Sequence, residues 1–198
     1  MHIGIYIYPE VEVLDFAGPF EVFSTANRVR QDDERFSVSL IAEADAVVQA
    51  RGGFSVAPQY TFSNHPPIDL LCIPGGVHER VLGQATSRQW IERSAQQAQR
   101  VATICTGVFL LAETDLLRAK RVTTHWEDIA ALREQFGALQ VLENYRWVSD
   151  GKYISSGGIS AGIDMSLFLV SELIDLSTAE RTARQMEYRW QKNPMTTA

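Results

Sequence analysis

The chain has 198 residues, of which 45% are hydrophobic and 21% are charged, and its formal net charge at pH 7 is −6. These proportions are ordinary for a soluble globular protein, and the length is sufficient to bury a substantial core. The lysines and arginines are scattered along an acidic chain, whereas nucleic-acid binding needs clustered positive charge, so we expect no nucleic-acid partner.

The sequence also gives no sign of a membrane segment or of secretion. Its apolar runs are shorter than the roughly 20 residues that cross a membrane, and it enters strand-like sequence at His2 without a signal peptide. The two cysteines, Cys72 and Cys105, lie in separate apolar runs with no secretory context for a disulfide. With no linker, repeat or low-complexity tract, residues 1–198 are predicted to form one cytoplasmic domain.

The N-terminal part predicts a buried strand over 2–8, followed by a helix in which Pro19 should lie in the first turn. Asp15, just before this helix, allows two interpretations. It can cap the helix, which is a common role of aspartate. Alternatively, because Leu14 and Phe16 flank it, it can lie in a desolvated place where its pKa rises and it serves as an acid or base.

The next stretch predicts a strand over 36–42, a β-hairpin over 47–57 and an almost unbroken apolar run over 68–73 that is typical of a central parallel strand. Gly75 and Gly76 follow directly. Glycines at this place let the backbone approach a ligand, and their N–H groups can form half of an oxyanion hole. A Pro-Gly-Gly sequence is also found in simple turns.

After a helix predicted over 87–99, Val101–Ile104 reads as a short strand and Val108–Ala112 as part of a helix, with Cys105 at the corner between them. A strand that turns sharply into a helix at such a residue is typical of a nucleophile elbow. The free N–H groups and dipole at the start of the helix would lower the pKa of the thiol. The alternative is that Cys105 is a small buried core residue.

A strand predicted over 122–126 places His125 at its carboxyl end, where it can point into the same crevice as Cys105, although a single histidine often has a structural role. Two further strands and a turn lead to a second small-residue corner over 156–162. That corner, which includes Gly158 and Ile159, would supply backbone N–H groups to the site. Helices are predicted over 163–174 and 178–191.

This alternation of strands and helices predicts an open α/β sheet with helices on both faces. Ligands of such sheets bind beyond the carboxyl ends of the strands. The glycine pair Gly75–Gly76, Cys105, His125 and the second corner all follow predicted strands. We therefore expect them to converge on one edge of the sheet.

Four segments resemble the ThiJ/PfpI superfamily of class I glutamine-amidotransferase-like proteins, and the resemblance covers nearly the whole chain. They are Ile73-Pro74-Gly75-Gly76, Ile104-Cys105-Thr106-Gly107, Val122-Thr123-Thr124-His125-Trp126 and Gly157-Gly158-Ile159-Ser160-Ala161-Gly162-Ile163-Asp164. The resemblance implies a flavodoxin-like three-layer sandwich with a mostly parallel central sheet and a nucleophile elbow. Because members are commonly dimers, it also implies a homodimer.

At two positions the sequence departs from patterns that are common in the superfamily, and these departures narrow the choice among its branches. Asp15, followed by Gly18 and Pro19, stands where much of the superfamily has a glutamate, and Thr106 stands where the protease and amidase branch has a histidine. The pattern is most similar to the isocyanide hydratases and to the amidotransferase-like domains of AraC-type regulators. Because the chain ends at Ala198, we expect no helix-turn-helix domain after it.

The hydratase resemblance implies a small-molecule isocyanide substrate and no metal or organic cofactor. Cys105 would be the nucleophile, Asp15 the acid and base, and Thr106 would hydrogen-bond Asp15 or the attacking water. Further contacts to substrate or intermediate would come from Gly75, Gly76, His125, Gly158 and Ile159. The alternative is a non-catalytic ligand-binding or regulatory domain.

Overall fold

The computed structural model describes residues 1–195, and within them seven strands form the central sheet in the order β10-β11-β7-β6-β1-β2-β5. The parallel strands are β1 (His2–Tyr6), β2 (Ser37–Ala42), β5 (Tyr60–Thr61), β6 (Leu70–Ile73), β7 (Arg100–Thr103) and β11 (Tyr153–Ser156). Only the edge strand β10 (Trp147–Asp150) runs antiparallel to its neighbour. The predicted mostly parallel sheet is confirmed.

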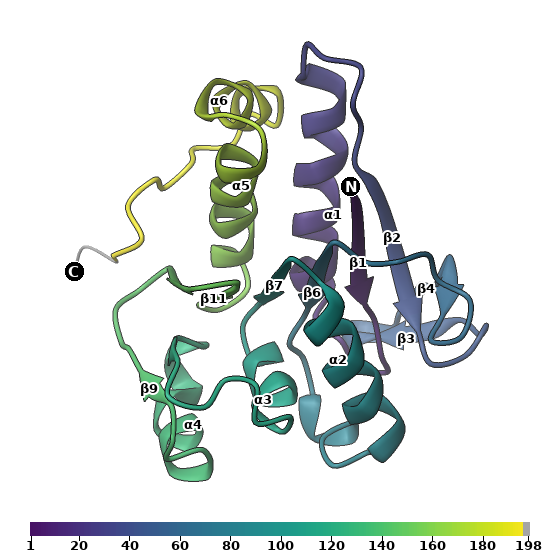
Figure 1. Cartoon of the computed structure of the whole chain (residues 1–198), viewed down its shortest axis with the longest axis vertical. Coiled ribbons are helices and arrows are strands. Elements are labelled where there is room, and N and C mark those ends of the chain that lie inside the picture. The colour runs from purple at the N-terminus through teal and green to yellow at the C-terminus, as the bar shows by residue number, and fades with distance from the viewer. Residues whose placement is uncertain (196–198) are drawn as a thin grey trace.

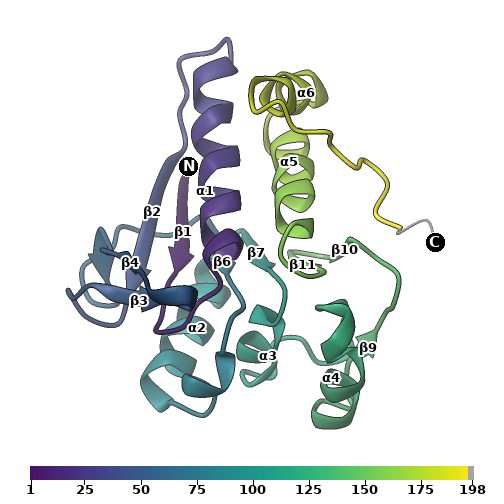
Figure 2. The same cartoon turned by 180° about the vertical axis from the view of Figure 1, so that it is seen from behind.

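Helices cover both faces of this sheet, which gives the expected three layers (Figure 1). On one face α1 (Val13–Val29) packs against α5 (Ala161–Leu173) and α6 (Leu176–Gln185). The other face carries α2 (Ala85–Gln97) and α3 (Gly107–Ala112), as the view from behind also shows (Figure 2). None of the helices in the described part of the chain combines the length and the hydrophobicity that a membrane crossing requires.

The central strands are apolar on both sides because both of their faces are covered. β1 and β6 are buried along their whole length, and Ile5, Cys72 and Ala102 lie in register across three neighbouring strands. Continuous apolar sequence is what a doubly covered parallel sheet requires. The predicted hairpin is also confirmed, with β3 (Val48–Ala50) antiparallel to β4 (Phe54–Val56).

Helix α1 begins earlier than the sequence indicates. Glu12 is its N-cap residue, Asp15 lies inside its first turn, and Pro19 lies in its interior. The predicted capping role of Asp15 is therefore wrong, and so is the expectation that Pro19 stays in the first turn. The proline removes one helical hydrogen bond to the carbonyl of Asp15, and burial of the helix against α5 and α6 outweighs this loss.

The segment after α3 differs most from the prediction. The elbow helix ends at Ala112, and the strand expected over 122–126 contains only Val122 of that range, because β8 (Arg121–Val122) pairs with β9 (Gln140–Val141) outside the main sheet. Together with α4 (Ile129–Gln135) these strands form a small unit below the carboxyl ends of the central strands (Figure 1). Helix α6 ends at Gln185, six residues before its predicted end.

Candidate active site

Cys105 occupies a strained corner between β7 and α3. Its φ angle is +54°, in the left-handed region that residues other than glycine rarely adopt. Gly107 makes the corner possible, because a Cβ at that position would overlap the carbonyl group of Ile73 at the end of β6. Cys105 is only 7% exposed. The sequence motif thus folds as the predicted nucleophile elbow.

Asp15 projects from the first turn of α1 and is completely buried. Its Oδ2 accepts a hydrogen bond of 2.9 Å from the N–H of Gly75, whereas its Oδ1 is buried without a hydrogen-bond partner among residues 1–195. Burial raises the pKa of Asp15 to about 8, against the opposing effect of the Gly75 N–H and of the neighbouring Cys105 thiol. The carboxyl group is therefore desolvated and its pKa is raised, as the second interpretation of Asp15 predicted.

The thiol of Cys105 also holds its proton. Burial, followed by the charge of Asp15, raises the pKa of Cys105 to about 12, although the backbone N–H groups of Ile159 and Thr106 oppose the rise. The expectation that the elbow lowers this pKa is wrong. Helix α3 has only six residues, and the loss of hydration exceeds what its N-terminus supplies. Burial thus favours the protonated forms of both the sulfur and the carboxyl group.

Gly75 holds Asp15 in place, and Gly76 holds Thr106, the residue after Cys105. The N–H of Gly76 donates to Oγ1 of Thr106 at 3.1 Å, and the Thr106 hydroxyl donates to the Gly76 carbonyl at 3.2 Å. Thr106 is therefore paired with Gly76 rather than with Asp15, and neither glycine N–H is directed to the thiol as an oxyanion donor. A Cβ at Gly75 would lie 2.6 Å from the N of Thr106 and 3.0 Å from Oδ2 of Asp15, so only glycine fits.

His125 reaches the site from outside the main sheet. It follows β8 as the N-cap residue of a short 3-10 helix, where its Nδ1 accepts from the N–H of Glu127 at 3.4 Å. The preceding residue, Thr124, donates its hydroxyl to the Cys105 carbonyl at 2.9 Å. The imidazole ring lies so close to Gly158 that a Cβ there would overlap it. The strand-end position predicted for His125 is wrong, and the cavity that His125 lines does not include Cys105, so a crevice shared with the thiol stays a prediction.

Ile159 is the residue of the second corner that faces the thiol. Its φ angle of +42° is unusual for a β-branched residue, and its N–H points to the sulfur of Cys105 while its side chain is 37% exposed. The corners that end β6, β7 and β11 do meet, because these strands are neighbours in the sheet. The predicted convergence therefore holds for all three strands.

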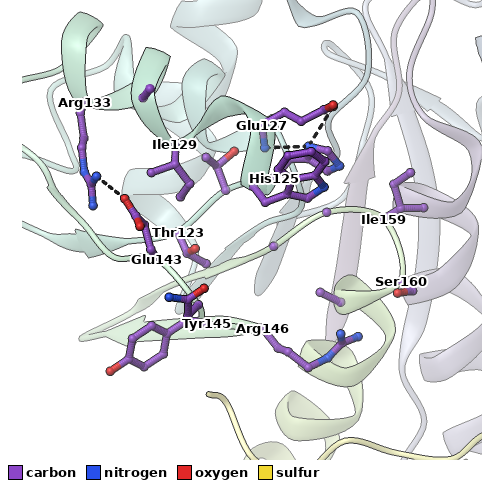
Figure 3. Close-up of a pocket in the computed structure, with 17 residues that line it drawn as sticks. Thr123, His125, Glu127, Ile129, Arg133, Glu143, Tyr145, Arg146, Ile159 and Ser160 are labelled. Atoms are coloured by element: carbon purple, nitrogen blue, oxygen red, sulfur yellow. Dashed lines mark hydrogen bonds and ion pairs between the residues drawn. The ribbon is translucent and has the colours of Figure 1, made fainter. Parts of the chain in front are cut away.

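A cavity of about 910 Å3 lies beside this site and was not predicted from the sequence. Thr124, His125, Gly158 and Ile159 line it, whereas Cys105 and Asp15 lie behind that wall. Its other side is formed by Arg133 of α4 and by the loop of Glu143, Tyr145 and Arg146 (Figure 3). These residues carry no motif, and their positions depend on how the small unit of α4, β8 and β9 docks against β10.

Comparisons with known proteins agree with this geometry. The family model described as DJ-1/PfpI family matches residues 1–172. The isonitrile hydratase of Pseudomonas putida is 34% identical over 189 residues, which cover 95% of this chain and 78% of that protein. The HTH-type transcriptional regulator GbdR of Pseudomonas aeruginosa is 26% identical over 85% of this chain, which spans only 45% of the regulator.

A solved structure shows the same fold. A ThiJ/PfpI family protein from Pseudomonas syringae superimposes with a TM-score of 0.85 at 27% identity. The match covers 94% of this chain and 74% of that one.

Proposed function

The chain belongs to the DJ-1/PfpI family, and from this premise we propose that it hydrates isocyanides to N-substituted formamides. The similarity to an isonitrile hydratase over 95% of the chain supports the proposal. The observation that carries it is the pairing of the Cys105 thiol with a buried Asp15 whose pKa is raised to about 8. An isocyanide carbon must receive both a nucleophile and a proton, and this pair offers both.

In the first step the sulfur of Cys105 attacks the terminal carbon of the isocyanide while Asp15 gives its proton to the same carbon. The S–H bond breaks, and its proton passes to the carboxylate that Asp15 has become. The product is a thioimidate, R–N=CH–S–Cys105, with Asp15 protonated again. Because the carboxyl group relays the proton, sulfur never has to exist as a free thiolate, which suits its raised pKa.

In the second step water adds to the thioimidate carbon, one of its protons reaching the nitrogen by way of Asp15. The C–S bond then breaks and the proton of the new hydroxyl group returns to sulfur. This releases the formamide R–NH–CHO and restores the thiol of Cys105. The N–H groups of Ile159 and Thr106, which are directed at the sulfur, stabilise the negative charge that develops there in both steps.

The test is to incubate the protein with an alkyl isocyanide, quench it in acid and analyse its peptides by mass spectrometry, with NMR detection of formamide in the supernatant. We expect a transient adduct with the full mass of the isocyanide on the Cys105 peptide, together with formamide release. Cys105→Ala should abolish both while keeping the circular dichroism spectrum of the folded protein. Cys72→Ala is the matched control and should retain turnover, because Cys72 lies within β6.

A ligand-binding domain of the regulator type is the second candidate. The similarity to GbdR over 85% of this chain favours it. In that case formamide would not form, and Cys105→Ala would bind the ligand as well as the wild type does. An adduct on Cys72 alone would contradict both candidates.

A further inference from the structure

The cavity beside the elbow shares a wall with the thiol site. Thr124 lines the cavity and at the same time holds the Cys105 carbonyl, and Ile159 turns its N–H to the sulfur and its side chain to the cavity. Figure 3 shows the opposite wall, where Arg133, Glu143 and Tyr145 face this segment across the open space. A volume of about 910 Å3 is in the range of sites that bind small organic molecules.

Resting on the proposed function, we propose that this cavity receives the organic substituent on the isocyanide nitrogen and selects an uncharged one over an anionic one. An isocyanide is linear from its substituent through nitrogen to carbon, so the substituent extends straight away from the carbon that sulfur attacks. Asp15 and the buried start of α3 close the inner sides of the thiol site. The remaining side of the thiol site is formed by Ile159, which is partly exposed and borders the cavity and the solvent.

The two arginines of the cavity already have partners, which is the argument for an uncharged substituent over an anionic one. Arg133 pairs with Glu143 and donates to the carbonyl of Val141 at 2.9 Å. Arg146 donates to the fully buried Asp164 at 2.6 Å. An anionic substituent would therefore lose its hydration without gaining a cation.

The remaining lining supplies apolar contact for such a substituent. Among the described residues that line the cavity, Ile129, Ala130 and Ile159 have aliphatic side chains, and Trp126, whose residue is 77% exposed, presents an aromatic ring. Tyr145 adds a second aromatic ring (Figure 3). Neutral alkyl and aryl groups would displace water from these surfaces, which favours their binding.

The first arm of the test changes the size of the cavity. Ala130 is an exposed residue of α4 that lines it, so Ala130→Trp should fill part of the space without disturbing the core. We expect KM for a bulky aryl isocyanide to rise about tenfold or more, whereas KM for methyl isocyanide and kcat for both change little. Ala44→Trp, the same change at an exposed position outside the cavity, is the control and should leave all values unaltered.

The second arm changes the charge. Glu143→Gln removes the partner of Arg133, which the Val141 carbonyl still holds in place. For an isocyanide bearing a carboxylate, kcat/KM relative to a neutral isocyanide of the same size should rise about fivefold. Glu180→Gln breaks the surface pair with Lys192 outside the cavity and should not change this ratio.

The outcomes separate this inference from the proposed function. If the wild type hydrates isocyanides and neither Ala130→Trp nor Glu143→Gln changes the kinetic values as expected, the cavity assignment is overturned and the hydratase proposal stands. A wild type that hydrates no isocyanide at all would overturn both. A carboxylate-bearing isocyanide that already outperforms its neutral counterpart in the wild type would overturn the selection for uncharged substituents.

Discussion

At the scale of single residues, the site is defined by two groups that retain their protons. Asp15 and Cys105 are buried together, and burial disfavours the charged form of each, while the charge of Asp15 raises the pKa of the thiol further. In the proposed mechanism Cys105 is the nucleophile, and because its thiol is protonated it depends on Asp15 for proton transfer. The consequence is that removing the titratable proton of Asp15 should stop the chemistry even if the shape of the site is kept.

Asp15→Asn tests this dependence. The amide keeps the size of the carboxyl group and can still accept the hydrogen bond from Gly75, but it cannot relay a proton. We expect kcat to fall by on the order of a hundredfold or more. Asp15→Glu keeps the carboxyl group but moves it by one methylene, so it should also be impaired. Steady-state kinetics of folded variants measure both, and full activity of Asp15→Asn would refute the proposed mechanism.

The pH profile gives an independent check on Asp15. The mechanism uses its protonated form, so kcat/KM should fall as pH rises through about 8, the pKa to which burial raises this group. A profile that instead rises over the same interval would indicate a free thiolate nucleophile. The measurement is kcat/KM for one neutral isocyanide between pH 6 and about pH 10.

At the scale of secondary-structure elements, the site depends on three strand-to-helix corners brought side by side. β6, β7 and β11 are adjacent, so the segments that leave their carboxyl ends meet without long connections. The corners can approach each other only because they lack side chains where backbones touch. Gly107, against the backbone at the end of β6, is the closest of these contacts, and Gly158 leaves the same kind of space for the imidazole ring of His125.

Gly107→Ala should therefore destabilise the protein, because the new methyl group would overlap the Ile73 carbonyl, and backbone cannot move aside as a flexible side chain can. We expect a loss of roughly 2 kcal/mol or more in the free energy of unfolding, or an insoluble product. Gly137→Ala is the control, since a Cβ there meets open space and the variant should unfold like the wild type. Urea denaturation of both variants measures the difference.

At the scale of the whole molecule, the buried carboxyl group of Asp15 makes the free energy of unfolding depend on pH. Because the pKa of Asp15 is raised on folding, the folded protein binds this proton more tightly than the unfolded chain does. The stabilising contribution of that proton is complete below about pH 4 and is lost as pH rises to about 8. Above that pH the folded protein carries a buried charge.

The wild type and Asp15→Asn should consequently diverge in stability as pH rises. Between about pH 4 and about pH 8 the free energy of unfolding of the wild type should fall relative to that of the variant. The slope is at most about 1.4 kcal/mol per pH unit. Urea unfolding of the two proteins at several pH values measures it. A constant difference between them would mean that the pKa of Asp15 is not raised.

The sequence by itself determined the class of fold and the position of the strand-to-helix corner at Cys105. Apolar runs such as 68–73 identify doubly covered strands, because a strand buried on both faces cannot alternate polar and apolar residues. Small residues around Cys105 and Gly158 indicate sharp corners, because a sharp turn of the backbone leaves little room for side chains. Both signals lie within a few neighbouring residues, which is why they can be read without the structure.

Only the tertiary structure decided the ionisation of the site and the shape of its surroundings. A helix N-terminus after Cys105 indicates a lowered pKa, but burial against α1 raises it, and burial depends on residues distant in sequence. His125, Arg133 and Glu143 come to line one cavity through the docking of β8, β9 and α4, for which the chain carries no local pattern. Desolvation and docking are sums over many long-range contacts, whereas strands and turns are set by near neighbours.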